Sequence, residues 1–230
     1  MAIKPRDMAK MIDHTNLSPT ATVDDIKKLC EEAKEHEFAS VCVNPIYVPL
    51  AAKLLEESSV KVCTVVGFPL GANATEVKSY ETRNAIKNGA QEIDMVMNIG
   101  AFKSGAYEIF KADIKSVVDA TKKAGVSSDI IVKVILECCY LDEEEIVKAC
   151  EIVKDSGADF VKTSTGFGPE GATIEGVSLM RKTVGRDIGV KASGGIKNFD
   201  QALDMLDAGA NRIGASSGVE IVTGKGVDAD

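Results

Sequence analysis

The sequence predicts an α/β fold, a single-domain (β/α)8 barrel of the TIM type that spans residues 1–230. Short runs rich in β-branched residues alternate regularly with longer stretches of helical periodicity, which indicates a parallel sheet with crossover helices. Eight such runs fit into a length that barrels of this type commonly fill as one unit. A Gly-Ala pair followed by an apolar run also recurs, in NGAQEIDMV, SGADFVKTS and AGANRIGAS. This internal echo favours a closed barrel of repeated units over an open sheet.

The predicted strands are short and separated by turn or helix signals. In chain order they are MAKMIDHT (8–15), FASVCVN (38–44), KVCTVVGF (61–68), EIDMVMNIG (92–100), DIIVKVILE (129–137), DFVKTSTG (159–166), DIGVKASGG (187–195) and NRIGASSG (211–218).

The segments between these strands are typical of amphipathic helices. The stretch TVDDIKKLCEEAKEHE (22–37) opens with Thr22 and Asp24 and carries apolar residues at helical spacing. The stretches LDEEEIVKACEIVKDSG (141–157) and NFDQALDMLDAGA (198–210) follow the same pattern, with an Asp or Asn near the start and a glycine near the end. We expect residues 219–230, at the C-terminus, to be a loose tail.

The overall charge argues against several classes of partner. Lys and Arg number 27 against 35 Asp and Glu, so the formal net charge is −8 and the average field repels nucleic acid and anionic membranes. The first residues lack the apolar core of a signal peptide, and no window approaches about eighteen consecutive apolar residues. Six cysteines lie mostly inside apolar runs without a CxxC pair, which predicts reduced thiols. We therefore expect a cytoplasmic protein with a small-molecule substrate.

Two lysines occupy the ends of neighbouring predicted strands. Lys162 in FVKTS and Lys191 in GVKAS are followed at once by small and hydroxylated residues, whereas Lys133 in IVKVI lies deeper in its strand. Alternation along a strand turns the flanking Val161 and Val190 outward, so both ammonium groups should point into the barrel. The C-terminal ends of the strands form the reactive end of such a barrel. Snorkelling to solvent remains an alternative for a single lysine, but two inward lysines suggest a function.

A pair of lysines and a carboxylate suits amine catalysis. A free lysine has a pKa of about 10.4, and a second ammonium nearby together with partial desolvation favours the neutral, nucleophilic amine. Asp94 within EIDMV is a carboxylate in an apolar strand, and it could move protons while a Schiff base forms. Asp13 in MIDHT is a weaker candidate of the same kind. A purely structural ion pair stays open as the alternative for Asp94.

Glycines and serines after the last three strands predict an anion site. Barrels often bind phosphate at the loops after strands seven and eight, through backbone N–H groups. The candidates are Gly166, Gly194, Gly195, Gly214, Ser216 and Ser217. The stretch GFGPEG (166–171) also matches GxGxxG, but its interior proline and the missing open-sheet context make a nucleotide site a weak alternative. With His14 and His36 as the two histidines, we expect no metal and no cofactor.

The segments EIDMVMNIG, FVKTSTGFG, VKASGGI and GASSG, in this order and spacing, closely resemble the deoxyribose-phosphate aldolase family. The resemblance covers nearly the whole chain. It implies a metal-independent class I aldolase, a lyase that reversibly cleaves 2-deoxy-D-ribose 5-phosphate to D-glyceraldehyde 3-phosphate and acetaldehyde. It implies that Lys162 forms the Schiff base, that Lys191 activates it and that Asp94 works with both in proton transfer. It also implies phosphate binding at the glycines and serines named above. Since barrels of this kind are commonly oligomeric, we expect a homo-oligomer, a dimer or a tetramer.

Two departures from the family pattern stand out. Some members carry a lysine directly after the KTSTG glycine, where this chain has Phe167, and some use a C-terminal tyrosine that the stretch 219–230 lacks. A water held by Asp94 is the expected substitute for that tyrosine. Two other functions stay open on the sequence alone: another Schiff-base aldolase or transaldolase acting on a different phosphosugar, and a noncatalytic phosphosugar-binding barrel.

Overall fold

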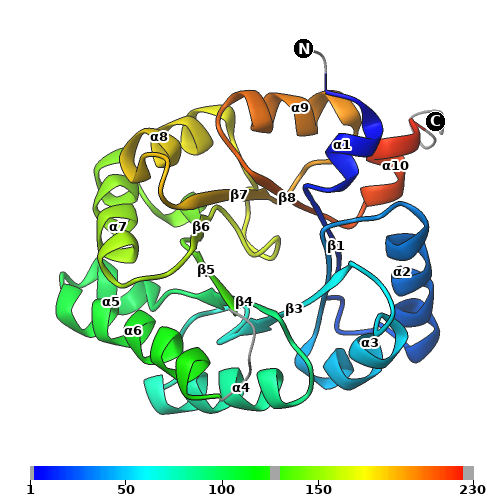
Figure 1. The fold of residues 1–230 in the computed structure, drawn as a ribbon. Coiled ribbons are helices and arrows are strands. Elements are labelled where there is room, and N and C mark those ends of the chain that lie inside the picture. The colour runs from blue at the N-terminus through cyan, green and yellow to red at the C-terminus, as the bar shows by residue number, and fades with distance from the viewer. Residues whose placement is uncertain (1–2, 125–129, 225–230) are drawn as a thin grey trace.

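The computed structural model describes residues 3–124 and 130–224, and its centre is a closed barrel of eight parallel strands (Figure 1). Each strand pairs with its chain neighbours, and β8 pairs with β1 to close the barrel. The strands are β1 Ile12–Asn16, β2 Ser40–Val43, β3 Lys61–Val66, β4 Glu92–Val96, β5 Ile131–Ile135, β6 Phe160–Lys162, β7 Gly189–Ser193 and β8 Arg212–Ala215. The predicted barrel is therefore confirmed.

All eight predicted strands are present, and each is shorter than its predicted range. The first prediction, 8–15, begins too early because α1 Pro5–Ala9 includes Met8 and Ala9. Pro5 favours a helix start, since its fixed φ suits the first turn and its missing N–H is not needed there. The predicted sixth strand, 159–166, ends at Lys162, and residues 163–166 belong to the loop that follows.

An outer layer of helices surrounds the barrel (Figure 1). Besides α1, it contains α2 Val23–Glu35, η1 Pro45–Tyr47, α3 Val48–Leu54, α4 Thr75–Lys87, α5 Ile99–Lys103, α6 Tyr107–Lys123, η2 Cys138–Tyr140, α7 Glu143–Asp155, α8 Ile174–Val184, α9 Phe199–Asp207 and α10 Gly218–Thr223. The three helices predicted by their patterns are confirmed as α2, α7 and α9. Reciprocal capping by Thr22 with Asp25 opens α2, and Asp142 with Glu145 opens α7 in the same way.

The C-terminal segment differs from the expected loose tail. Residues 218–223 form α10, which packs against α1, α9 and β1, with Ile221 fully buried. The expectation is wrong for residues 219–223 because the apolar side chains of the segment complete the contact between the first and last elements of the barrel. Residues 225–230, also part of that expectation, lie outside the described residues.

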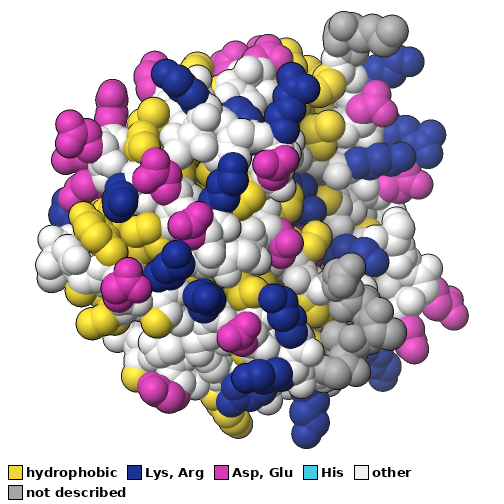
Figure 2. Space-filling view, turned by 60° about the vertical axis from the view of Figure 1, so that its left-hand side comes forward, with side chains coloured by type: hydrophobic (Ala, Val, Ile, Leu, Met, Phe, Trp, Pro, Cys, Tyr) yellow, Lys and Arg dark blue, Asp and Glu magenta, His cyan; other side chains and the backbone are white. Residues whose placement is uncertain are grey.

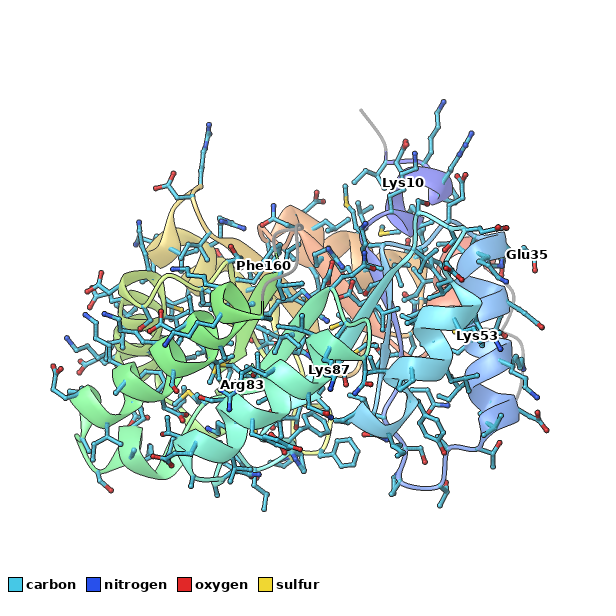
Figure 3. The ribbon with its side chains drawn as sticks, turned by 60° about the horizontal axis from the view of Figure 1, so that its bottom comes forward. Lys10, Glu35, Lys53, Arg83, Lys87 and Phe160 are labelled. Carbon is cyan, nitrogen blue, oxygen red and sulfur yellow. The ribbon has the colours of Figure 1, made fainter. Side chains whose placement is uncertain are left out.

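The main apolar core lies between the strands and the helices. Val161 and Val190 are both buried there, which leaves Lys162 and Lys191 on the inner face of the barrel. Charged side chains of the outer helices, such as Glu35, Arg83 and Lys87, are exposed (Figure 3). On the face shown in Figure 2, acidic and basic side chains are interspersed. Within the described residues, no helix combines the length and apolarity needed to cross a bilayer.

Candidate active site

A cavity of about 590 Å³ opens at the C-terminal end of the barrel. The loops after β1, β6, β7 and β8 line it together with the inward side of α2. Lys162 is among its lining residues, and so are all six residues of the predicted anion site. These are Gly166, Gly194, Gly195, Gly214, Ser216 and Ser217. The structure thus gathers the predicted residues around one space, and their part in binding stays a prediction.

Asp94 lies fully buried in β4, and it joins the candidate lysines. Its Oδ2 accepts hydrogen bonds from Lys162 Nζ at 2.8 Å and from Lys191 Nζ at 2.7 Å. Lys162 and Lys191 are register partners on β6 and β7, so their side chains enter the barrel side by side. Asp94 Oδ1 accepts a third bond, from Lys133 Nζ at 2.9 Å. One carboxylate therefore holds three ammonium groups.

Below this carboxylate the ion pairs continue through the barrel interior. Lys133 Nζ lies 2.5 Å from Glu92 Oε2, and Lys191 pairs with Asp13. Arg212 donates through Nε to Asp13 Oδ1 at 2.9 Å and through Nη2 to Glu92 Oε2 at 2.9 Å. Lys133 therefore lies deep, as its position within an apolar run predicts, and Asp13 binds Lys191 rather than Lys162.

The charges of this interior network do not cancel. It contains four cations and three carboxylates, which are Lys133, Lys162, Lys191, Arg212, Asp13, Glu92 and Asp94. Lys191 and Lys133 each pair with more than one carboxylate, whereas among the described residues Lys162 pairs with Asp94 alone. Lys162 also lines the cavity. Lys162 is therefore the lysine of the network that combines a single carboxylate partner among the described residues with access to the cavity.

The pKa shifts of Asp94 and Lys191 indicate which of these two groups is charged at neutral pH. Burial alone would raise the pKa of Asp94, but the charges of Lys133, Lys162 and Lys191 outweigh it and hold that pKa well below the usual range. Burial would likewise lower the pKa of Lys191, but Asp13 and Asp94 raise it above the usual value. At neutral pH, Asp94 is thus an anion and Lys191 a cation.

The same shifts predict that the protein is less stable in acid. Asp13 and Asp94 have lowered pKa values because lysines, and for Asp13 also Arg212, outweigh the effect of burial. Their stabilisation is complete above the unfolded pKa of about 3.9 and is lost as the pH falls toward the lower folded values. We expect the free energy of unfolding in urea to drop steadily from about pH 5 to about pH 3. A constant free energy over that range would contradict this linkage.

The groups that could hold a metal fit one poorly. Among the described residues, the ligand atoms of Cys42, Cys63 and Asp94 lie within 4.8 Å of one another. Three ammonium groups already surround Asp94, so a cation at this place would meet positive charge. The buried His14 lies at the cavity with its Nε2 2.7 Å from Glu32 Oε2, and burial lowers its pKa. His14 does not belong to the group formed by Cys42, Cys63 and Asp94.

Aromatic side chains from opposite loops meet at the mouth of the barrel. Phe68 follows β3 and Phe167 follows β6, and their rings contact edge to face with centroids 5.3 Å apart. Phe68 also packs on an inward apolar cluster formed by Leu17, Cys42, Cys63 and Val65. One side of the barrel mouth is therefore apolar, while the cavity occupies the polar side near β6, β7, β8 and β1.

Glu92 and Arg212 are not among the site residues predicted from the sequence. Glu92 stands two residues before Asp94 in the same strand, so strict alternation places both carboxylates on one face. That spacing is a signal that could have identified it. Arg212 becomes a partner of Asp13 because β8 pairs with β1, and this closure brings together residues almost a full chain length apart.

Comparison with known proteins places the chain among aldolases. A family model described as DeoC/LacD family aldolase matches residues 7–224. A deoxyribose-phosphate aldolase of Caldanaerobacter subterraneus subsp. tengcongensis is 62% identical over 216 residues, which is 94% of this chain and 92% of the relative. Another, of Thermoanaerobacter sp. (strain X514), is 60% identical over 216 residues, which is 94% of this chain and 96% of the relative.

Solved structures agree with these relatives. An aldolase called QR15 superposes with a TM-score of 0.88 and 45% identity, and 94% of each chain is covered. The deoxyribose phosphate aldolase from Aeropyrum pernix, described as having a unique tetrameric structure, superposes with a TM-score of 0.87. Its identity is 35%, and the match covers 95% of this chain and 91% of that one.

Proposed function

The chain belongs to the DeoC/LacD family of aldolases, and from this premise we propose that it is a deoxyribose-phosphate aldolase. It is a lyase that reversibly cleaves 2-deoxy-D-ribose 5-phosphate to D-glyceraldehyde 3-phosphate and acetaldehyde through a lysine Schiff base. The observation that carries the proposal is the carboxylate of Asp94 shared by two lysines, of which Lys162 lines the cavity. A barrel that only binds a phosphosugar has no need of this arrangement.

The reaction begins with attack of the neutral Lys162 amine on the C1 aldehyde of the open-chain sugar. The resulting carbinolamine loses water to give a protonated Schiff base. Removal of the proton from the C3 hydroxyl then lets the C2–C3 bond break. The fragment that contains C3, C4 and C5 of the sugar leaves as D-glyceraldehyde 3-phosphate. The electron pair of the broken C2–C3 bond moves into an enamine on Lys162. Protonation of the enamine carbon and hydrolysis release acetaldehyde and free the amine.

Asp94 supplies the proton transfers of this sequence, and Lys191 activates Lys162. Asp94 Oδ2 lies 2.8 Å from Lys162 Nζ, within reach of a proton on the nitrogen or on the carbinolamine hydroxyl. Lys191 remains a cation beside it and so favours the neutral amine at Lys162. In this proposal, a water held by Asp94 delivers the proton to the enamine carbon.

The phosphate end of the substrate lies on the loops after β6, β7 and β8. Gly166, Gly194 and Gly195 have φ values of 87°, 88° and 82°, which a side chain would strain, so glycine suits these turns. Their backbone N–H groups, with Gly214 and the hydroxyls of nearby serines, provide neutral donors for an anion. The lining also contains Lys197, whose ammonium adds positive charge.

Two measurements test the proposed function. The protein should convert 2-deoxy-D-ribose 5-phosphate to glyceraldehyde 3-phosphate, detected by a coupled dehydrogenase. Incubation with acetaldehyde followed by borohydride should then leave an ethyl group on Lys162, located by peptide mass mapping. An unmodified Lys162 in folded, active protein would sink the Schiff-base route. Conversion of a different phosphosugar in place of this substrate would favour another aldolase of the same class.

Replacing Asp94 by asparagine should slow the reaction and destabilise the fold. We expect kcat to fall by about 10²- to 10³-fold, since a general acid–base group is lost. The free energy of unfolding should fall by about 3 kcal/mol, because three buried ammonium groups lose a shared anion. Steady-state kinetics and urea unfolding measure the two effects. The exposed Asp155→Asn in α7 is the matched control, and a kcat within threefold of the wild type would contradict the assigned role.

Phe167 stands where some family members carry a lysine, and it is 54% exposed at the cavity. Replacing it by lysine should lower the KM for the phosphorylated sugar by about three- to tenfold, because a charge-assisted hydrogen bond to phosphate becomes possible. The value of kcat should stay within about twofold. Phe167→Gln, which removes the ring without adding charge, is the control, and an equal KM for both variants would refute an electrostatic cause.

The wider setting follows from the same premise. The protein acts as a single catalytic domain in the cytoplasm, in the catabolism of deoxyribose phosphate, and forms a homo-oligomer, a dimer or a tetramer. The tetrameric relative from Aeropyrum pernix supports the assembly, and six free cysteines support a reducing compartment. Molar mass by light scattering tests the assembly.

A further inference from the structure

Glu137 follows β5 in an uncommon conformation. Its φ of 55° and ψ of 63° lie in the left-handed region, which is strained for a non-glycine residue. Among the described residues, the other non-glycine residue with positive φ is Glu37, in the exposed turn after α2. Glu137 is instead buried, with 3% of its surface exposed. A buried residue in this conformation needs compensating contacts from its side chain.

The carboxylate of Glu137 finds these contacts in the loop after β6. Its Oε1 accepts a hydrogen bond from the backbone N–H of Thr165 at 3.0 Å, and its Oε2 accepts one from the Thr165 hydroxyl. None of the ion pairs formed among the described residues includes Glu137. Two donors of a single residue, Thr165, therefore bind the Glu137 carboxylate. This contact links the loop after β5 to the loop after β6.

Thr165 connects the Glu137 carboxylate to the residues that line the cavity. Its Oγ1 accepts a hydrogen bond from Phe167 N–H at 3.0 Å, which closes a turn around Gly166. All three residues line the cavity that contains Lys162. The chain then runs close over Glu137, since a Cβ added at Gly168 would stand 3.2 Å from the Glu137 Cδ and 2.9 Å from Cys139 Sγ. The shape of residues 165–168 thus depends on Glu137.

The side chain of Lys162 is held by a different carboxylate. The backbone N–H of Leu136 donates to Lys162 O at 2.9 Å, which continues the sheet beyond β5. The amine of Lys162 donates a hydrogen bond to Asp94 Oδ2 at 2.8 Å. The amine of the nucleophile and the turn 165–167 are therefore bound by different carboxylates, Asp94 and Glu137.

We propose that Glu137 is a positioning residue for substrate recognition, which shapes the turn 165–167 so that it can bind the phosphate of the sugar. This inference rests on the proposed function and deepens it. Glu137 acts on the phosphate end of the substrate and not on the chemistry at C1. The preference of the enzyme for a phosphorylated over an unphosphorylated sugar should therefore depend on a carboxylate that does not touch the substrate.

Replacing Glu137 by glutamine puts an NH2 donor against one of the two Thr165 donors and removes the charge. We expect KM for 2-deoxyribose 5-phosphate to rise about tenfold with kcat within about twofold, since a hydrogen bond to a charged group is lost. Activity on unphosphorylated 2-deoxyribose should stay within about twofold, as should borohydride trapping of acetaldehyde on Lys162. The exposed Glu143→Gln, in the first turn of α7, is the matched control.

Variants of Thr165 test the same contact from the other side. Thr165→Val removes the hydroxyl that Glu137 binds and should reproduce the selective loss, while Thr165→Ser keeps the hydroxyl and should restore most of the affinity. If Glu137→Gln does not fold, Thr165→Val and Thr165→Ser decide the question. The quantity compared is again the activity on the phosphorylated sugar relative to that on the unphosphorylated sugar. Equal losses on both sugars, or no loss on either, would overturn the inference. A wild-type protein inactive on both sugars and not trapped by borohydride would instead overturn the proposed function.

Discussion

Replacing Lys162 by methionine should abolish cleavage, with kcat lowered by about 10⁴-fold or more. Methionine has a similar length but no amine, so neither the carbinolamine nor the Schiff base can form. Asp94 keeps Lys133 and Lys191 as partners, and the interior network then contains equal numbers of cations and carboxylates. We therefore expect the variant to fold, with a free energy of unfolding close to that of the wild type.

The comparison needs a lysine substitution elsewhere in the barrel. Lys61→Met, at the exposed start of β3, lies at the opposite end of the strands from the cavity and should keep full activity. Kinetics on 2-deoxyribose 5-phosphate, borohydride trapping with acetaldehyde, and urea unfolding should be measured for both variants. Retention of more than about one per cent of the wild-type rate by folded Lys162→Met would exclude Lys162 as the nucleophile.

Replacing Lys191 by leucine should lower the rate at neutral pH by about 10²- to 10³-fold. The interior network would lose its surplus positive charge, so a neutral Lys162 amine would leave an uncompensated anion. We expect the acid limb of the pH–rate profile to move upward by about one to two pH units, so that part of the lost rate returns at alkaline pH.

The shift of the profile separates activation from a structural role. The dependence of kcat/KM on pH should be measured for wild type and Lys191→Leu, with the free energy of unfolding as the check on folding. Asp13 retains Arg212 as a partner in this variant, which limits the loss of stability. An unchanged profile with uniformly reduced activity would show that Lys191 orients the site without favouring the neutral amine.

The sequence predicts the barrel well because strand and helix periodicities are local. It also predicts which side of each strand Lys162, Lys191 and Asp94 face, since alternation fixes this once the strand is located. Their meeting on one oxygen depends on the stagger of the barrel, which a strand pattern does not contain.

The role of Glu137 is not predicted by the sequence pattern. In the sequence it continues an apolar run, DIIVKVILE, and is indistinguishable from the last residue of a strand. Its left-handed backbone and its bonds to Thr165 arise from the packing of two loops that lie far apart along the chain. Neither propensity nor charge pattern reports such a contact, because it is set by tertiary structure alone.

The interior ion network also affects the register in which the strands of the barrel pair. Its charged groups come from β1, β4, β5, β6, β7 and β8, so most strands contribute to it. If one of these strands slipped by a residue during folding, its charged side chain would turn into the apolar layer beneath the helices. An unpaired buried charge costs several kcal/mol, so misaligned barrels are strongly disfavoured. The residues proposed for catalysis thereby also discriminate against misfolded pairings of the sheet.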